Sequence, residues 1–297
     1  MRFLTLGKSS AVAIMAAAVV FQAPFAGAAE HRDNDPIEPF AIADGLYYVG
    51  STDIASYLFV TRDGLILIDG GLADTAPQIL KNIATLGFQP RQVKILLNTH
   101  GHFDHAAGFA QLKRETGATF YASKADGDLI AHGGKGDFFL GPLYGDRPTA
   151  YEPLKPDRTL SDGEKISLGG VTLTAHITAG HTKGCTTWTF PATVAGKTEQ
   201  GLILCSNSIL RGYKLVNNPA YPGQAADYEK SYAFWRAAPC DLFLASHGHF
   251  IGFPEKRAAL LAGKADAFVD PKGCKAFFDA TYADFKAELD RQAAAAP

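Results

Sequence analysis

The segment THGHFDH, residues 99–105, carries four metal-binding side chains within six positions, directly after an apolar run. That run, residues 93–98, is short, β-branched and aliphatic, so it suits a buried strand better than a helix. Residues i and i+2 of extended backbone project to the same side, so His100 and His102 can reach one ion. The other two ligands follow where the chain turns into a predicted helix, residues 106–114, and their changed direction suits a second ion. We therefore predict a zinc site here rather than a surface cluster of histidines.

Two further apolar runs lead into histidine. Residues 171–178 are followed by His181, and residues 241–245 are followed by His247. Because ligand sites in α/β sheets gather outside the carboxyl ends of strands, we expect the three runs to meet at one sheet edge. His249 is an alternative to His247, since it lies two residues further and faces the same way in extended backbone. The remaining histidines are expected to be structural: His31, His132 and His176.

The first 28 residues have the pattern of a signal peptide. Basic Arg2 and Lys8 precede the apolar residues 11–21, and Ala26–Ala28 offers a small-residue cleavage site. The apolar core is shorter than the ~20 residues that a membrane span requires. We expect cleavage after Ala28, location in the periplasm, and no membrane contact afterwards.

The remaining chain, residues 29–297, has the length of one domain, and we expect a monomer. Cleavage removes two positive charges from a chain of net charge −2, and no basic stripe is left. Nucleic acid is therefore not an expected partner. The Gly-rich residues 133–145 are expected to form a loop, either a wall of the active site or an ordinary surface loop. They do not complete a phosphate-binding loop, so nucleotide binding has no support.

Four cysteines allow three full disulfide pairings, and export to an oxidising compartment lets disulfides persist. Cys240 precedes the third His-terminated run and Cys274 begins the last predicted helix, so a bond between them would tie helix to sheet. Cys185 and Cys205 each lie at one end of an apolar strand pattern and could pair across neighbouring strands. A zinc site made of all four cysteines is the rival interpretation, but no Cys-x-x-Cys spacing supports it.

Strand and helix patterns are mixed in both halves of the chain. Predicted strands lie near 46–49, 56–60, 65–71, 93–98, 165–178, 186–190, 201–205 and 241–245, and predicted helices over 76–86, 106–114, 226–237 and two closing segments. This mixture predicts an α/β chain with sheet layers covered by helices, and it excludes a helical bundle or an all-β barrel.

The pattern His-x-His-x-Asp-His from His100 to His105 resembles the hallmark of the metallo-β-lactamase superfamily. More closely, the chain is similar to the zinc β-lactamases of subclass B3. The likeness extends over nearly all of the mature chain, through residues 67–71, 98–108, 179–184, 212–215 and 240–247. It implies an αββα sandwich, in which two packed mixed sheets are flanked by helices and zinc lies at one edge. It also implies a disulfide between Cys240 and Cys274.

The resemblance implies a ligand set for two zinc ions: His100, His102 and His181 for the first, and Asp104, His105 and His247 for the second. A zinc site with three protein ligands keeps a position open for water, whose pKa can fall to about 7. Zinc-bound hydroxide would attack the lactam amide, and Asp104 would also orient it as the catalytic residue. Asp69 is interpreted either as a partner of a ligand histidine or as the cap of a turn.

Residues 204–208 discriminate among hydrolases of this superfamily, because thioesterases and many lactonases place a metal-bridging Asp there. None is present. Other zinc β-lactamases use a cysteine ligand at this position, which makes Cys205 an alternative unless it pairs with Cys185. Subclass B3 has serines instead, so the resemblance implies that Ser206 and Ser208 bind the substrate carboxylate. A simple polar strand end is the other interpretation.

The sequence thus predicts an exported di-zinc β-lactamase that confers resistance to β-lactam antibiotics. The alternative is a related metallo-hydrolase that acts on a lactone, a thioester or another ester. A third hypothesis is a zinc-binding protein without catalytic activity. Serine catalysis is disfavoured because neither Ser-x-x-Lys nor Gly-x-Ser-x-Gly occurs in the chain.

Overall fold

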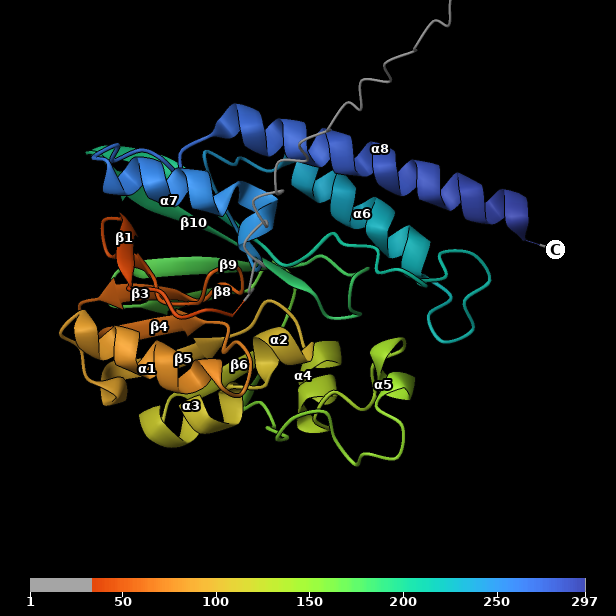
Figure 1. The fold of residues 1–297 in the computed structure, drawn as a ribbon, viewed down its shortest axis with the longest axis horizontal. Helices are drawn as coiled ribbons and strands as arrows, with labels where there is room; N and C mark the ends of the chain where they lie inside the picture. Colours follow the sequence, from red (N-terminus) through yellow and green to blue (C-terminus); the bar gives the residue numbers. More distant parts are fainter. Residues whose placement is uncertain (1–33, 297) are drawn as a thin grey trace, which may run out of the picture. The chain divides into compact units, whose positions relative to one another are not determined.

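In the computed structural model, which describes residues 34–296, two β-sheets pack against each other between layers of helices (Figure 1). The predicted signal peptide lies outside the described residues. The first sheet has seven strands in chain order: β1 (Phe40–Ala43), β2 (Leu46–Tyr48), β3 (Tyr57–Thr61), β4 (Gly64–Ile68), β5 (Val93–Leu97), β6 (Thr119–Ser123) and β7 (Arg158–Leu160). Its strands pair antiparallel from β1 to β4 and parallel from β4 to β7.

The second sheet has the order β12-β11-β10-β9-β8. Its strands are β8 (Lys165–Leu168), β9 (Val171–Ile177), β10 (Thr186–Val194), β11 (Lys197–Leu204) and β12 (Leu242–Ala245). Only β11 and β12 pair parallel, so both sheets are mixed. The strand predicted over residues 165–178 is divided by a turn at Gly169 and Gly170, whose positive φ angles break the extended run.

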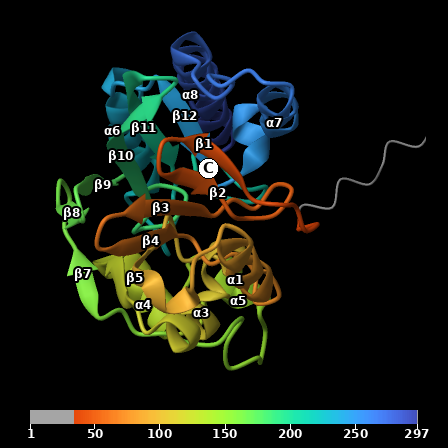
Figure 2. The same cartoon turned by 90° about the vertical axis from the view of Figure 1, so that its left-hand side faces the viewer.

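Helices cover the outer faces of the two sheets (Figures 1 and 2). Those beside the first sheet are α1 (Thr75–Thr85), α2 (Phe103–Ala106), α3 (Phe109–Thr116), α4 (Lys124–Ala131) and α5 (Leu140–Leu143), and those beside the second are α6 (Gln224–Ala237), α7 (Phe253–Leu261) and α8 (Pro271–Ala295). Short 3₁₀ turns occupy Pro90–Gln92 and Gly248–Ile251. The predicted αββα sandwich is confirmed. The prediction of a loop throughout residues 133–145 was wrong at α5, because a single helical turn is too short to show periodicity.

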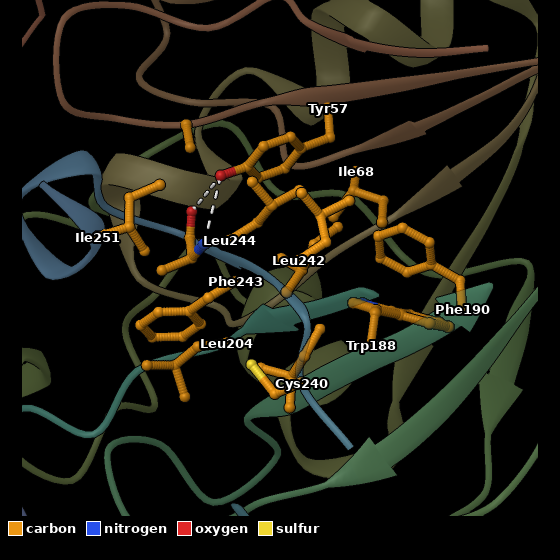
Figure 3. Packing of buried hydrophobic residues seen from close by; sticks show 14 of the residues in the cluster. Tyr57, Ile68, Trp188, Phe190, Leu204, Cys240, Leu242, Phe243, Leu244 and Ile251 are labelled. Carbon is orange, nitrogen blue, oxygen red and sulfur yellow. Dashed lines mark hydrogen bonds between the residues drawn. The ribbon is translucent and has the colours of Figure 1, made fainter. Parts of the chain in front are cut away.

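The main core lies between the two sheets. Figure 3 shows Tyr57 and Ile68 of the first sheet packed near Trp188 and Phe190 of the second. The buried Tyr57 hydroxyl donates to the Ala245 carbonyl at 2.7 Å, so its polar atom is satisfied across the two sheets. A second core fills the space between the first sheet and helices α1 and α3. Strands such as β5 are buried on both faces, which explains their nearly continuous apolar sequence.

Two disulfides are present among the described residues. Cys185 and Cys205 join the start of β10 to the end of β11, with Cα atoms 5.8 Å apart. Cys240 and Cys274 join the segment before β12 to the first turn of α8, with Cα atoms 6.4 Å apart. Within residues 34–296, no helix combines the length and apolar character needed to cross a membrane.

Candidate metal centre

The strand ends of both sheets bring together the six predicted ligands. β5 leads into His100, and His102 caps the start of α2, which carries Asp104 and His105. The other two come from the second sheet, where His181 follows β9 and His247 follows β12.

Three of the histidines form a first group, which corresponds to the predicted first ion. The ring centroids of His100 and His102 are 5.0 Å apart, those of His100 and His181 are 4.8 Å apart, and those of His102 and His181 are 4.7 Å apart. One ligand nitrogen from each histidine lies within 4.8 Å of the others. All three side chains are buried, so their nitrogens face one another in a space with little competing water.

The second group is centred on Asp104. Its Oδ2 lies 3.2 Å from His105 Nε2 and 3.2 Å from His247 Nε2. These two imidazole nitrogens are themselves 3.0 Å apart. His100 lies between the groups, because its ring centroid is 4.2 Å from that of His105. Two imidazoles and a carboxylate therefore direct their ligand atoms at one small region.

The donor set suits zinc, which is bound in proteins by imidazole nitrogen and carboxylate oxygen. Burial, together with the neighbouring His102, lowers the pKa of His181 to about 3, so its imidazole is neutral at pH 7. Burial likewise holds the pKa of His100 well below its usual range. Although burial would raise the pKa of Asp104, the His105 and His247 imidazoles hold it well below its ordinary value. Neutral imidazoles and an ionised carboxylate are the forms that bind a metal.

Several ligand histidines have a partner at the ring nitrogen that faces away from the group. His181 Nδ1 donates to the Ser208 carbonyl at 2.9 Å, and His247 Nδ1 lies 2.7 Å from Asp53 Oδ2. His102 Nε2 lies 3.3 Å from Asp137 Oδ2. Such partners fix the ring plane and the tautomer of a ligand histidine.

Asp69 caps the end of β4 and also lies near a predicted ligand histidine. Its carboxylate accepts the Thr99 N–H at 2.6 Å and the Thr99 hydroxyl at 2.7 Å, and Oδ2 lies 3.4 Å from His105 Nδ1. Asp69 has a φ of 64°, in the left-handed region that costs a non-glycine residue about 1 kcal/mol. The same side chain thus shapes the strand end and faces a predicted ligand.

Three buried or partly buried carboxylates of the site were not predicted from the sequence. Asp126 of α4 accepts hydrogen bonds from the Gly101 N–H at 2.9 Å, the Thr182 hydroxyl at 2.7 Å and the Gly184 N–H at 2.9 Å. It therefore joins the segment of His100 and His102 to that of His181. The pattern Ser123-x-x-Asp126 could have indicated the start of α4.

The other two missed carboxylates are Asp53 and Asp137. Asp137 lies in the Gly-rich segment and faces His102, which favours the interpretation of that segment as a wall of the site. The adjacent Phe139 packs edge-on against Tyr213, with ring centroids 4.8 Å apart. No local pattern marked either acid, because each meets its histidine only through the tertiary fold.

The two predicted substrate-binding serines lie beside the first group. Ser206 is buried and its hydroxyl accepts the Ser208 N–H at 3.2 Å, while Ser208 is half-buried and supports His181 through its carbonyl. Cys205 is bonded to Cys185, so it is not a metal ligand in this disulfide-bonded form. A cavity of about 560 Å³ adjoins this segment, with residues 207–212 on one side and α8 on the other.

The remaining histidines of the described chain lie outside both groups. His249 is 58% exposed, and its Nδ1 lies 3.0 Å from Asp53 Oδ2. His176 makes a 2.8 Å hydrogen bond with the Thr189 hydroxyl and stacks on Phe234. His132 Nδ1 donates to the Asp128 carbonyl at 2.7 Å. His31 lies outside the described residues.

With this geometry in view, comparisons with known proteins establish the family. The sequence model of the metallo-beta-lactamase superfamily matches residues 49–194. The native FEZ-1 metallo-beta-lactamase from Legionella gormanii is 43% identical to this chain, with a TM-score of 0.84 over 87% of this chain and 98% of that one. The chain belongs to the metallo-beta-lactamase superfamily. This member is also 35% identical to BJP-1, a subclass B3 metallo-beta-lactamase of Bradyrhizobium japonicum, with a TM-score of 0.81 over 89% and 98% of the two chains.

A curated relative gives a shorter match to this superfamily member. A probable metallo-hydrolase of Burkholderia pseudomallei is 30% identical over 115 residues, which is 38% of this chain. The match spans only 36% of the length of that relative. The chain therefore resembles the two β-lactamase structures over almost their whole length and the curated hydrolase over about a third of it.

Proposed function

We propose that this protein is an exported zinc β-lactamase that hydrolyses the β-lactam amide with two zinc ions and so confers resistance to β-lactam antibiotics. The observation that carries the proposal is the convergence of five histidines and one aspartate from both sheets on two adjoining groups. The likeness to FEZ-1 over 98% of its chain supports the same conclusion.

In this proposal the first group holds one zinc ion and the second group holds the other. The ligands are His100, His102 and His181 for the first ion, and Asp104, His105 and His247 for the second. When bound, zinc in such sites acts as a Lewis acid on a carbonyl and lowers the pKa of water to about 7.

The side chains of the protein position the reactants. Asp104 is 22% exposed, so it reaches the solvent side of the site while Oδ2 faces the His105 and His247 nitrogens. In this arrangement Asp104 would also accept a hydrogen bond from the attacking water and orient it toward the lactam carbonyl. The buried His100 and His181 exclude bulk water from the inner side, which strengthens electrostatic interactions at the reacting bond.

Ser206 and Ser208 are proposed to bind the carboxylate of the β-lactam. The Ser206 oxygen accepts the Ser208 N–H, which leaves its own hydroxyl hydrogen available to donate. Ser208 Oγ is the more accessible of the two hydroxyls, since Ser208 is only half-buried. A carboxylate bound there would place the substituents of the substrate near the cavity lined by residues 207–212.

The proposed setting is the periplasm, after removal of residues 1–28, with the mature protein acting as a monomer without nucleic acid or membrane partners. The two disulfides support export, because disulfides persist in oxidising compartments and are rare in the cytosol.

The test is a substrate panel on purified mature protein of measured zinc content. We expect loss of lactam absorbance with a penicillin, a cephalosporin or a carbapenem, and no loss with Asp104→Ala that folds normally. Lactone and thioester substrates are assayed in parallel. Faster hydrolysis of one of those would support the alternative hydrolase, and a zinc-loaded protein that turns over nothing would support the non-catalytic binding protein.

A further inference from the structure

Asp53 lies in the turn between β2 and β3, far in sequence from the histidine that it contacts. Its buried carboxylate lies 2.7 Å from His247 Nδ1 through Oδ2 and accepts the His249 backbone N–H at 2.6 Å through Oδ1. His249 Nδ1 lies 3.0 and 3.1 Å from the two carboxylate oxygens. One carboxylate of the first sheet is therefore surrounded by donors from the segment after β12.

The backbone on both sides of Asp53 is already attached to the same segment. The Gly248 N–H donates to the Asp53 carbonyl at 2.8 Å, and the Ala55 N–H donates to the Ser246 carbonyl at 2.9 Å. Ile54 and His247 form an isolated antiparallel bridge. Since these contacts hold the two segments together without the Asp53 side chain, the carboxylate has a further role available to it.

We infer that Asp53 is a positioning residue that selects the tautomer of His247 and aims its Nε2 at the second metal group, with His249 holding the carboxylate in place. The inference rests on the proposed metal centre. A carboxylate only accepts, so Asp53 keeps a hydrogen on Nδ1 of His247 and leaves Nε2, 3.2 Å from Asp104 Oδ2, as the nitrogen that would bind a metal in place of a proton. Among the described residues, no other proposed ligand histidine has a carboxylate oxygen this close to the ring nitrogen that faces out of its group; the Asp137 and Asp69 contacts are 3.3 and 3.4 Å.

If Asp53 selects the tautomer of His247, replacing it with Asn should harm metal binding more than replacing it with Ala. In Asp53→Asn the amide oxygen must face the His249 backbone N–H, which can only donate, so the amide NH₂ faces His247 Nδ1. The imidazole then accepts at Nδ1 and carries its hydrogen on Nε2, which blocks that nitrogen as a ligand. In Asp53→Ala the imidazole has no partner and can still adopt the productive tautomer. A tautomer-selecting role therefore makes Asn the more harmful change, whereas a purely structural role makes Ala the more harmful one.

The experiment is a titration of metal-free wild type, Asp53→Asn and Asp53→Ala with Zn²⁺ against a chromophoric chelator, and with Co²⁺ followed by its visible spectrum. We expect the wild type to bind two ions. The second ion should bind about 10 to 100-fold more weakly in Asp53→Asn. The loss should be smaller in Asp53→Ala, and the affinity for the first ion should stay within about threefold in both variants. Asp241→Asn is the matched control, because its carboxylate accepts the Gln200 N–H at 2.9 Å before β12, away from the metal groups.

Urea unfolding of the metal-free variants serves as the control that each one folds. Wild-type affinity for both ions in folded Asp53→Asn would overturn the inference, as would a larger loss in Asp53→Ala than in Asp53→Asn. A wild type that binds fewer than two ions would overturn the proposed two-ion centre itself, and with it this role of Asp53. The metal-binding results do not depend on which substrate the protein hydrolyses. A protein that binds two zinc ions but hydrolyses no β-lactam would therefore contradict the proposed function and leave the role of Asp53 standing.

Discussion

The buried carboxylate of Asp126 offers a quantitative test of how the site is supported. It satisfies two backbone donors, Gly101 N–H and Gly184 N–H, and the Thr182 hydroxyl. Each buried backbone N–H that loses its acceptor costs about 1 to 3 kcal/mol. Asp126→Ala removes the acceptor of both, so we expect the free energy of unfolding to fall by about 4 kcal/mol. Asp126→Asn keeps one oxygen and leaves one backbone donor without an acceptor, for a loss of about 2 kcal/mol.

The assay is urea unfolding of metal-free protein at pH 8. Burial raises the pKa of Asp126 to about 6, although the hydrogen bonds that the carboxylate accepts act to lower it. The carboxylate is therefore ionised at pH 8. Asp128→Asn is the control, because Asp128 lies on the same helix and its partner is the exposed Lys124. Its unfolding midpoint should equal that of the wild type. If Asp126→Asn also unfolded at the wild-type midpoint, the reasoning from buried donors would be refuted.

The same support explains why Gly184 is required beside Asp126. A Cβ atom at position 184 would lie 2.4 Å from the Asp126 backbone nitrogen and 2.3 Å from Ser123 Oγ. Both distances are shorter than any ordinary contact, and the first is to backbone that cannot move aside. Loss of the Asp126 carboxylate should also lower the affinity for the first zinc ion, because that carboxylate holds the Gly101 N–H and Gly101 lies between the ligands His100 and His102.

Three further predictions concern metal uptake, the disulfide and the substrate. Burial lowers the pKa of His105, but the Asp104 and Asp69 carboxylates outweigh it and raise the pKa to about 10. The metal-free protein therefore holds a proton on His105 at pH 7, and zinc must displace it. Calorimetry in buffers of different ionisation heat should detect the release of at least one proton on zinc binding, and the zinc affinity should rise with pH. A binding heat that does not depend on the buffer would contradict this. The double change Cys240→Ser and Cys274→Ser opens a loop with a sequence separation of 34 residues, and urea unfolding should show a loss of about 3 to 4 kcal/mol, whereas an unchanged midpoint would argue against stabilisation by loop closure. Ser208→Ala should lower kcat/KM for β-lactams about 10 to 100-fold through loss of a hydrogen bond to a carboxylate, and unchanged steady-state kinetics would remove Ser208 from the binding site.

The strand-end histidines could be located from the sequence because sheet topology gathers strand ends. β5, β9 and β12 have apolar patterns that identify strands, and the ligand segments follow each of them. Shorter elements escaped detection. β7 has three residues, and β6 runs directly into α4 without turn residues to mark the boundary.

The carboxylates that support the site could not be predicted in the same way. Asp53 meets His247 across 194 sequence positions, and Asp137 meets His102 across 35. Neither acid lies in a repeated or spaced pattern, because each contact forms only when two separate loops come together: loops of different sheets for Asp53 and His247, and two loops of the first sheet for Asp137 and His102. Local sequence therefore predicts the groups that bind the metal better than the groups that orient them.

The proposed metal ligands come from both sheets, and this division affects the stability of the folded protein and its resistance to proteolysis. His100, His102, Asp104 and His105 follow the first sheet, while His181 and His247 follow the second, so each ion would cross-link the two halves of the sandwich. A metal at 100 times its dissociation constant stabilises a folded protein by about 2.7 kcal/mol per site. Zinc limitation would then expose the seam between the sheets to opening and proteolysis, so the abundance of this protein would follow the zinc supply of its compartment.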